Sequence, residues 1–417
     1  MGITVEAEAP GYEPHDTTLT FENRHGVCRD KAALLVVLLR EAGFKAYPVI
    51  IHNGPKKDPE VPQPYFNHAI SSIELEDGTY LLMDSTDETT KELFPAYLCN
   101  QSYLVAKPEG ETLLTSPIVP ASENLMCVET QAAIDEDGTL TGRSRLVFEG
   151  INDNVYRGYL ARVKPEDRKK LFEGLVKAMA PGGRLTSFVL LPEDMGDTGQ
   201  ILEVELEFSA PEVLISDGNA SMVPLPRLGP RVGIVNFILG ATGLEERKYP
   251  LKTDIACGIE ERLSLRLAPG LGSVVSLPSF DPVENESLRW NRDLREVEDG
   301  LELTSTFSLE AVEFAPEEYK QLKSALKTLE FNGRKQVILS RGENEATAGL
   351  AADVEVLRSA VRYVVEDPHQ WVETQEVRKR INTYKGVKDA SELKLDYNPV
   401  WEEVKLVRAS VRNGDEE

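Results

Sequence analysis

The clearest helical signal in the chain follows Cys28. Apolar residues fill positions 32–39 (AALLVVLL), and Gly43 comes shortly after them. This run predicts a helix over Arg29–Ala42 that stops at Gly43. Because apolar residues surround the whole helix axis, we expect this helix to be central and buried on several sides.

Strand patterns come next along the chain. Residues 45–51 (KAYPVII) are rich in β-branched side chains and predict a strand, whereas the proline-rich stretch 52–65 predicts a loop. Two further strand-like runs, FNHAISSIELE and TYLLMDST, meet at residues 76–78 (EDG), where Asp-Gly favours a hairpin turn. Helix, strand, loop and hairpin together predict a small α+β unit over residues 1–120.

The register of this hairpin brings two polar side chains together. With Asp77 at the centre of the turn, His68 lies opposite residue 86. Asp84 is then two residues from the position opposite His68 and on the same face, within diagonal reach across the strands. A slip of one residue would separate them.

The pattern changes at about residue 126. Alternating runs and a second Asp-Gly turn at 137–138 predict β structure, with helices over 153–180, broken at Pro165, and over 316–331. We therefore expect 126–340 to form one or two sandwich-like domains with packed helices. Residues 345–375 have a helical composition, and the alternation after them predicts the start of a further β domain. That domain is expected to be truncated, because the chain ends on a turn signal, RNGDEE.

Composition excludes some functions. The 417 residues suit roughly two or three domains, and 70 acidic against 46 basic residues give a net charge of −24. Such a field repels phosphate backbones, and no basic run is longer than VRKR, so we expect no nucleic-acid partner. No apolar run reaches the roughly 18 residues that would cross a bilayer, so no membrane span is expected in this chain.

One of the four cysteines has unusual surroundings. Cys28 follows Gly26 and precedes two charged residues at the start of the predicted helix. A thiol nucleophile needs a lowered pKa, a base and a group that orients the base. The helix N-terminus supplies the first, and its N–H groups could also stabilise an oxyanion. His68 and Asp84 are candidates for the base and the orienting group.

These segments resemble a known family. GVCRDKAALLVVLLREAGFKAYPV followed by PYFNHAISSIELEDGTYLLMDST is similar to the core of the transglutaminase-like superfamily, a branch of the papain-like thiol fold. The resemblance covers roughly residues 20–120. It implies that Cys28 is the nucleophile, His68 the base and Asp84 the orienting group. It also implies acyl transfer or hydrolysis on a protein glutamine or peptide amide, with no metal or organic cofactor. Bacterial relatives are commonly exported, which suggests a periplasmic or cell-envelope location.

The sequence departs from the family pattern before the cysteine. Only 27 residues precede Cys28, and no tryptophan is among them. The C-terminal stretch YKGVKDASELKLDYNPVWEEVKLVRASV resembles the opening of the β domain that normally lies upstream of such a core. We therefore expect the chain to be a piece of a longer tandem protein, with a core that lacks its N-terminal part.

Other interpretations remain open at this point. The main alternative is a noncatalytic binding or scaffold protein of the cell envelope with a vestigial core. A redox role for Cys28 lacks a neighbouring resolving cysteine, and the pair His25 and Cys28 lacks further zinc ligands at suitable spacing. Asp30 and Lys31 are expected to cap the helix and form salt bridges. The three remaining cysteines are interpreted as structural: Cys99, Cys127 and Cys257.

Overall fold

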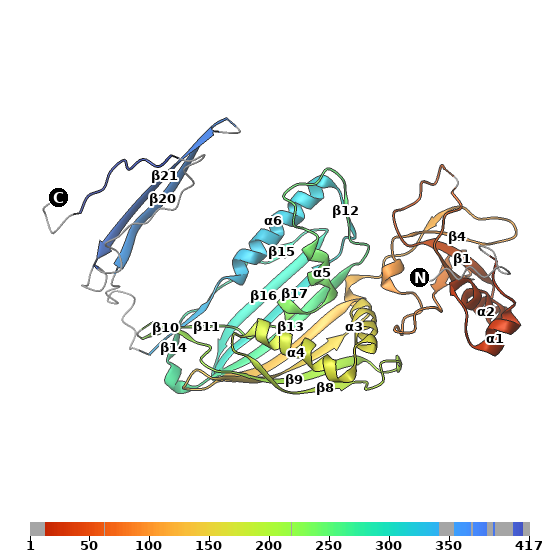
Figure 1. Ribbon diagram of the computed structural model, residues 1–417, viewed down its shortest axis with the longest axis horizontal. Coiled ribbons are helices and arrows are strands. Elements are labelled where there is room, and N and C mark those ends of the chain that lie inside the picture. Colours follow the sequence, from red (N-terminus) through yellow and green to blue (C-terminus); the bar gives the residue numbers. More distant parts are fainter. Residues whose placement is uncertain are drawn as a thin grey trace. The chain divides into compact units, whose positions relative to one another are not determined.

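The computed structural model describes residues 13–61, 63–217, 219–341, 354–367, 370–381, 387 and 403–411. The chain forms two compact units, Met1–Arg341 and Gly342–Glu417 (Figure 1). The boundary that the sequence suggests near residues 120–126 lies inside the first unit, and it stays a prediction. No helix of the described residues is both long and apolar enough to span a membrane.

The first unit begins with a small α+β region. Two helices precede a five-stranded antiparallel sheet whose order is β3-β2-β1-β4-β5. The second helix packs on β2 and β1. The elements are α1 (Thr17–Asn23), α2 (Cys28–Glu41), β1 (Ala46–His52), β2 (His68–Glu74), β3 (Tyr80–Met83), β4 (Ser102–Val105) and β5 (Leu114–Thr115).

Helix α2 agrees with the predicted bounds to within one residue at each end. Its burial does not agree, because Val37 and Leu38 are 39% and 51% exposed while Ala32 and Val36 are buried. The expectation of burial on several sides is therefore wrong. Among the described residues, the sheet covers the side that carries Ala32 and Val36 and leaves much of the rest to solvent.

The β2–β3 hairpin has the predicted register. Ser71 lies opposite Met83 and Ser72 opposite Leu82, which is the alignment that would set His68 opposite residue 86. Gly78 at the turn has a φ of 83°, a left-handed conformation that glycine adopts without a steric penalty. Local turn chemistry thus fixes how His68 and Asp84 are aligned.

The rest of the first unit is built on a large sheet of order β15-β16-β17-β13-β6-β7-β9-β8. All its neighbouring strands are antiparallel except β13 and β6. Its strands are β6 (Leu125–Ile134), β7 (Leu140–Phe148), β8 (Arg184–Leu191), β9 (Leu202–Ala210), β13 (Cys257–Leu267), β15 (Val283–Glu284), β16 (Leu288–Val297) and β17 (Gly300–Leu309).

Smaller sheets and four helices complete this region. A four-stranded sheet has the order β10-β11-β19-β14, and β12 pairs with β18. The helices are α3 (Ile151–Arg162), α4 (Pro165–Met179), α5 (Ile234–Gly240) and α6 (Pro316–Gly333). The strands are β10 (Ile215–Asp217), β11 (Ala220–Val223), β12 (Leu251–Lys252), β14 (Ser273–Ser276), β18 (Glu313–Phe314) and β19 (Val337–Ser340).

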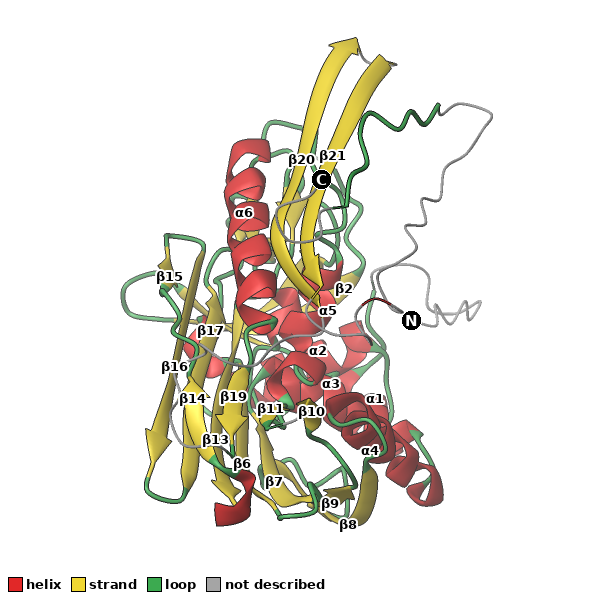
Figure 2. Cartoon of the chain, turned by 90° about the vertical axis from the view of Figure 1, so that its left-hand side faces the viewer, coloured by secondary structure: helices red, strands yellow, loops and turns green. Residues whose placement is uncertain are grey.

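The large sheet has one buried and one exposed face. Along β6, Met126 and Val128 are buried while Glu129 and Gln131 are exposed. Helices α3 to α6 lie across the buried face (Figures 1 and 2). The predicted mixture of helices and sheets is confirmed, and Pro165 begins a new helix as expected. Apolar residues of these helices share one core cluster with Val223, Val337 and Leu339 of the four-stranded sheet, and the sandwich-like arrangement stays a prediction.

The second unit corrects a prediction. A helix was expected over 345–375, but the described part forms a hairpin of β20 (Val354–Asp367) and β21 (Gln370–Ile381). Valine is the commonest residue of these strands, and β-branched side chains favour extended backbone. The rest of the predicted C-terminal β domain lies largely outside the described residues.

Candidate active site

Cys28 is the first residue of α2 and is half-buried. The first N–H groups bonded within the helix are those of Asp30 and Lys31, which both donate to the carbonyl of Val27. The N–H groups of Cys28 and Arg29 precede them, so they have no acceptor inside the helix. The thiol therefore lies at the electropositive end of a 14-residue helix.

His68 and Asp84 meet as the hairpin register predicts. The Nε2 atom of His68 is 2.8 Å from Oδ2 of Asp84, and their side chains are 6% and 0% exposed. The other ring nitrogen, Nδ1, is also buried and is not the atom bonded to Asp84. Cys28 interacts with this same imidazole, which brings the three predicted site residues together.

The electrostatics of the three groups are coupled. The pKa of the Cys28 thiol is lowered, first by hydrogen bonding to His68, against the opposing effect of burial, and then by the N–H of Ala69. Burial acts to lower the pKa of His68, but Asp84 and Cys28 together outweigh it and raise the pKa to about 9. Both directions favour a thiolate next to an imidazolium at neutral pH.

Further polar groups hold the carboxylate of Asp84. Its Oδ1 atom accepts from the N–H of Thr86 at 2.8 Å and from the hydroxyl of Thr86 at 2.6 Å. Its Oδ2 atom, already bonded to His68, lies 3.4 Å from the hydroxyl of Tyr97. The sequence interpretation missed both residues. Thr86 was detectable, because a threonine two positions after an aspartate often closes such a turn.

Asp30 and Lys31 have the roles that the sequence predicts. The carboxylate of Asp30 accepts from the N–H of Val27 at 3.1 Å and so caps α2. It also accepts from the N–H of His15 at 2.9 Å, which ties the segment before α1 to the helix start. Lys31 forms an ion pair with Glu88, four residues beyond Asp84. These contacts secure the backbone around the cysteine.

The other three cysteines differ from Cys28 in their electrostatics. Burial is the main cause that raises the pKa of Cys99 and of Cys127 to about 11, and of Cys257 to about 12. All four thiols are free. Cys28 is the cysteine of this chain whose pKa is lowered, as its position at a helix start predicts.

Two cavities of the described region lie away from the three residues, none of which is in their walls. One, of about 620 Å³, is lined by Ile50, Phe66 and Leu104 among others. Another, of about 460 Å³, lies beside Phe21 and His25. Among the described residues, no group of three or more His, Cys, Asp or Glu is arranged to hold a metal ion. The arrangement of Cys28, His68 and Asp84 therefore carries the functional argument.

The geometry is that of a thiol core with a histidine–aspartate pair. Residues 2–85, which contain all three residues, match the transglutaminase-like superfamily, and residues 367–417 match a domain of unknown function, DUF3857. The first segment is thus transglutaminase-like, as the resemblance predicted. No curated protein sequence matches the chain.

One solved structure is similar to the chain. It is described as a "putative protease" from Parabacteroides distasonis, and it is 13% identical with a TM-score of 0.40. The similarity covers 78% of this chain and 46% of that protein, so the chain spans less than half of its length.

Proposed function

We propose that the chain is an enzyme that transfers or hydrolyses acyl groups at protein or peptide amide bonds, with Cys28 as nucleophile. The buried hydrogen bond between His68 and Asp84, next to a thiol at a helix N-terminus, is the observation that carries this proposal. The transglutaminase-like character of residues 2–85 supports it.

The proposed reaction has two steps. The Cys28 thiolate attacks the amide carbonyl, a carbon–sulfur bond forms, and the carbonyl oxygen becomes an oxyanion near the N–H groups of Cys28 and Arg29. As the carbon–nitrogen bond breaks, the amine or ammonia leaves with a proton from Nδ1 of the His68 imidazolium. Water or an amine then attacks the thioester, gives its proton back to His68, and releases the thiolate.

Asp84 orients the base in this scheme. Its bond to Nε2 leaves Nδ1 of His68 free to face the thiol. The carboxylate also stabilises the imidazolium that the first step requires. Whether the acyl group passes to water or to an amine depends on the acceptor, which the three residues do not select.

Labelling of Cys28 with iodoacetamide tests the proposal. We expect the wild type to react with an apparent pKa well below the roughly 8.5 of a free thiol. His68→Ala should raise that apparent pKa and slow labelling at neutral pH by about tenfold for each unit. Mass spectrometry assigns the site, and Cys99 serves as an internal control because its pKa is raised.

An ordinary pKa at Cys28 in the wild type, or an unchanged profile in His68→Ala, would contradict the catalytic proposal. That result would favour the noncatalytic binding role, in which the core no longer performs chemistry.

A further inference from the structure

A series of polar contacts extends from Asp84 to helix α3 of the β-rich region. Tyr97, in a short 3-10 helix (Ala96–Leu98), has its hydroxyl 3.4 Å from Oδ2 of Asp84. The same hydroxyl interacts with Asp87. The Nδ2 atom of Asn154 on α3 donates to Oδ2 of Asp87 at 2.7 Å.

The hydroxyl of Tyr97 lies near two carboxylates and has one proton to donate in a hydrogen bond. A phenol has a single O–H, so it donates fully to either Asp84 or Asp87 at one time. After burial, which is the largest cause, both carboxylates raise the pKa of Tyr97, so the phenol keeps its proton. Which carboxylate accepts the hydrogen bond from this hydroxyl depends on the other donors that each carboxylate has.

Asn154 supplies Asp87 with such a donor. The other oxygen of Asp87, Oδ1, is bonded to the N–H and hydroxyl of Thr89 at 2.9 and 2.8 Å. With Thr89 on one oxygen and Asn154 on the other, Asp87 already accepts hydrogen bonds on both oxygens. It therefore gains less from a further hydrogen bond from Tyr97. The hydroxyl of Tyr97 is then free to donate to Asp84.

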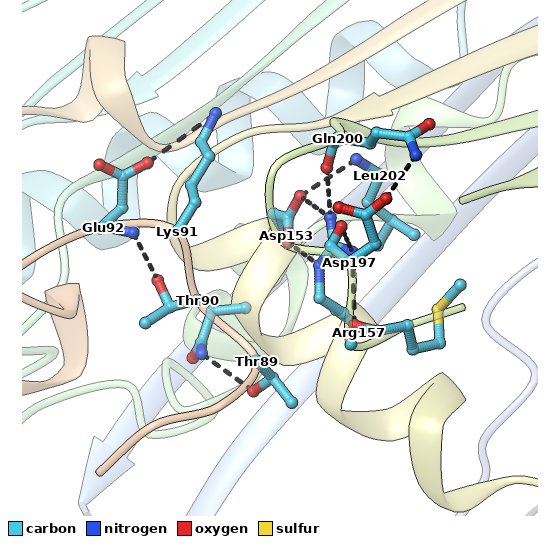
Figure 3. Close-up of polar contacts among 12 residues, drawn as sticks. Thr89, Thr90, Lys91, Glu92, Asp153, Arg157, Asp197, Gln200 and Leu202 are labelled. Atoms are coloured by element: carbon cyan, nitrogen blue, oxygen red, sulfur yellow. Dashed lines mark hydrogen bonds and ion pairs between the residues drawn. The ribbon is translucent and has the colours of Figure 1, made fainter. Parts of the chain in front are cut away.

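Helix α3 holds Asn154 in a fixed place. Asn152, Asp153 and Asn154 are all at least 92% buried, and each has a different set of partners. Asn152 accepts from the N–H of Ile234, and Asp153 pairs with Arg157. Figure 3 shows the contacts of Asp153 and Arg157, with the segment 89–92 beside them.

The loop after Asp84 approaches α3 closely. A Cβ atom added to Gly158, one turn beyond Asn154, would lie 3.3 Å from the hydroxyl oxygen of Thr89. Nδ2 of Asn154 also lies 3.3 Å from that oxygen. Glycine at this position therefore lets the loop and the helix touch.

We propose that Asn154 and Tyr97 are positioning residues for the triad, through which the β-rich region holds Asp84 in its working orientation. This inference rests on the proposed function. With Tyr97 donating, Asp84 has His68 and Tyr97 on one oxygen and Thr86 on the other. His68 and Thr86 already hold one oxygen each, and Tyr97 adds a second donor to Oδ2, which further restricts rotation of the carboxylate away from the imidazole. The transglutaminase-like segment then depends on α3 for its full reactivity.

Variants of the full chain test the proposal through the pH profile of Cys28 labelling. Tyr97→Phe and Asn154→Ala should each raise the apparent pKa of the thiol, and a rise of about one unit means about tenfold slower labelling at neutral pH. Asn236→Ala is the control, because it removes an amide bonded to Gly229 and Val232 within the β-rich region. It should leave the profile unchanged.

A reciprocal exchange separates positioning from general stability. Asn154→Asp alone sets two carboxylates face to face and should give the largest shift. The double variant Asn154→Asp with Asp87→Asn again pairs an amide with a carboxylate, with the donor now at position 87 and the acceptor at position 154. The wild-type pH profile of labelling should then return. Thermal unfolding of each variant is measured alongside.

The outcomes distinguish the two proposals. Fast labelling in the wild type with unchanged profiles in Tyr97→Phe and Asn154→Ala overturns the positioning role alone. Failure of the exchange to recover the profile, after Asn154→Asp has shifted it, also overturns that role. An ordinary thiol pKa in the wild type overturns both the positioning role and the proposed function.

Discussion

Cys28 and His68 change each other's protonation, and each by itself would behave differently. An isolated thiol with this degree of burial would have a raised pKa, as the other three cysteines have. The imidazole reverses that direction for Cys28, and the thiolate in turn helps to raise the pKa of His68. The two protons belong to the pair, so the pH behaviour of either residue reports on both.

We predict that His68 titrates at a pH of about 9. The chain has five histidines, so the imidazole signals can be assigned by NMR with single substitutions. Asp84→Asn should lower the midpoint, because it removes the carboxylate that stabilises the imidazolium. A wild-type midpoint near the ordinary value of 6.5 would contradict the ion pair.

The same titration sets a stability dependence. The folded pKa of His68 lies above its unfolded value, so the stabilisation is fully present below about pH 6.5. It is lost as the pH rises through about 9. The free energy of unfolding of the wild type relative to His68→Gln should therefore decline over this window.

At the scale of elements, α3 connects several parts of the first unit. The guanidinium of Arg157, 0% exposed, makes bonds of 2.6 and 2.8 Å to the carboxylate of Asp153. It also donates to the carbonyls of Met195, Asp197 and Gln200. This network joins the helix to the segment before β9 (Figure 3).

Removing one partner of this ion pair should be costly. We predict that Asp153→Ala lowers the free energy of unfolding by about 3–5 kcal/mol, because it leaves a buried guanidinium unpaired. The matched control is Glu173→Ala in α4, which breaks an exposed i,i+4 pair with Lys169 and should cost about 0.3–0.5 kcal/mol.

Urea unfolding of both variants gives the comparison. Equal decreases in the free energy of unfolding of Asp153→Ala and Glu173→Ala would show that the buried network stabilises the fold no more than an exposed ion pair does. Replacing Asp153 and Arg157 together by Leu and Met should recover much of the loss, since no buried charge then remains.

At the scale of the whole molecule, the buried core belongs to the first unit. All buried apolar residues among those described lie between Ala32 and Leu339, and the β20–β21 hairpin contributes none. A two-stranded hairpin by itself adds little stability in water. The unfolding of the first unit is therefore expected to be independent of residues 342–417.

Truncation tests this expectation. A chain that ends at Arg341 should keep the wild-type thermal unfolding midpoint and the labelling rate of Cys28. A chain that ends at Gly333 should lose stability, because it removes Val337 and Leu339, which are 0% exposed in β19. A lower unfolding midpoint in the chain that ends at Arg341 would show that the two units stabilise each other.

Short-range patterns determined much of the core. The apolar run after Cys28 set α2, and the Asp-Gly turn set the register that aligns His68 with Asp84. Both features depend on residues at most 16 positions apart, where turn chemistry and side-chain alternation decide the outcome. The catalytic roles of the three residues remain predictions.

The tertiary structure decided what surrounds these residues. Asn154 reaches Asp87 across 67 positions of sequence, and no local pattern encodes a contact at that separation. The exposure of one side of α2 likewise depends on which elements cover it, and apolar composition does not reveal this. For the 354–381 hairpin, β-branched residues in pairs across the strands outweighed an apparent helical composition. Sequence therefore supplied the candidate catalytic residues, and packing between distant segments supplied the contact of Asn154 with Asp87.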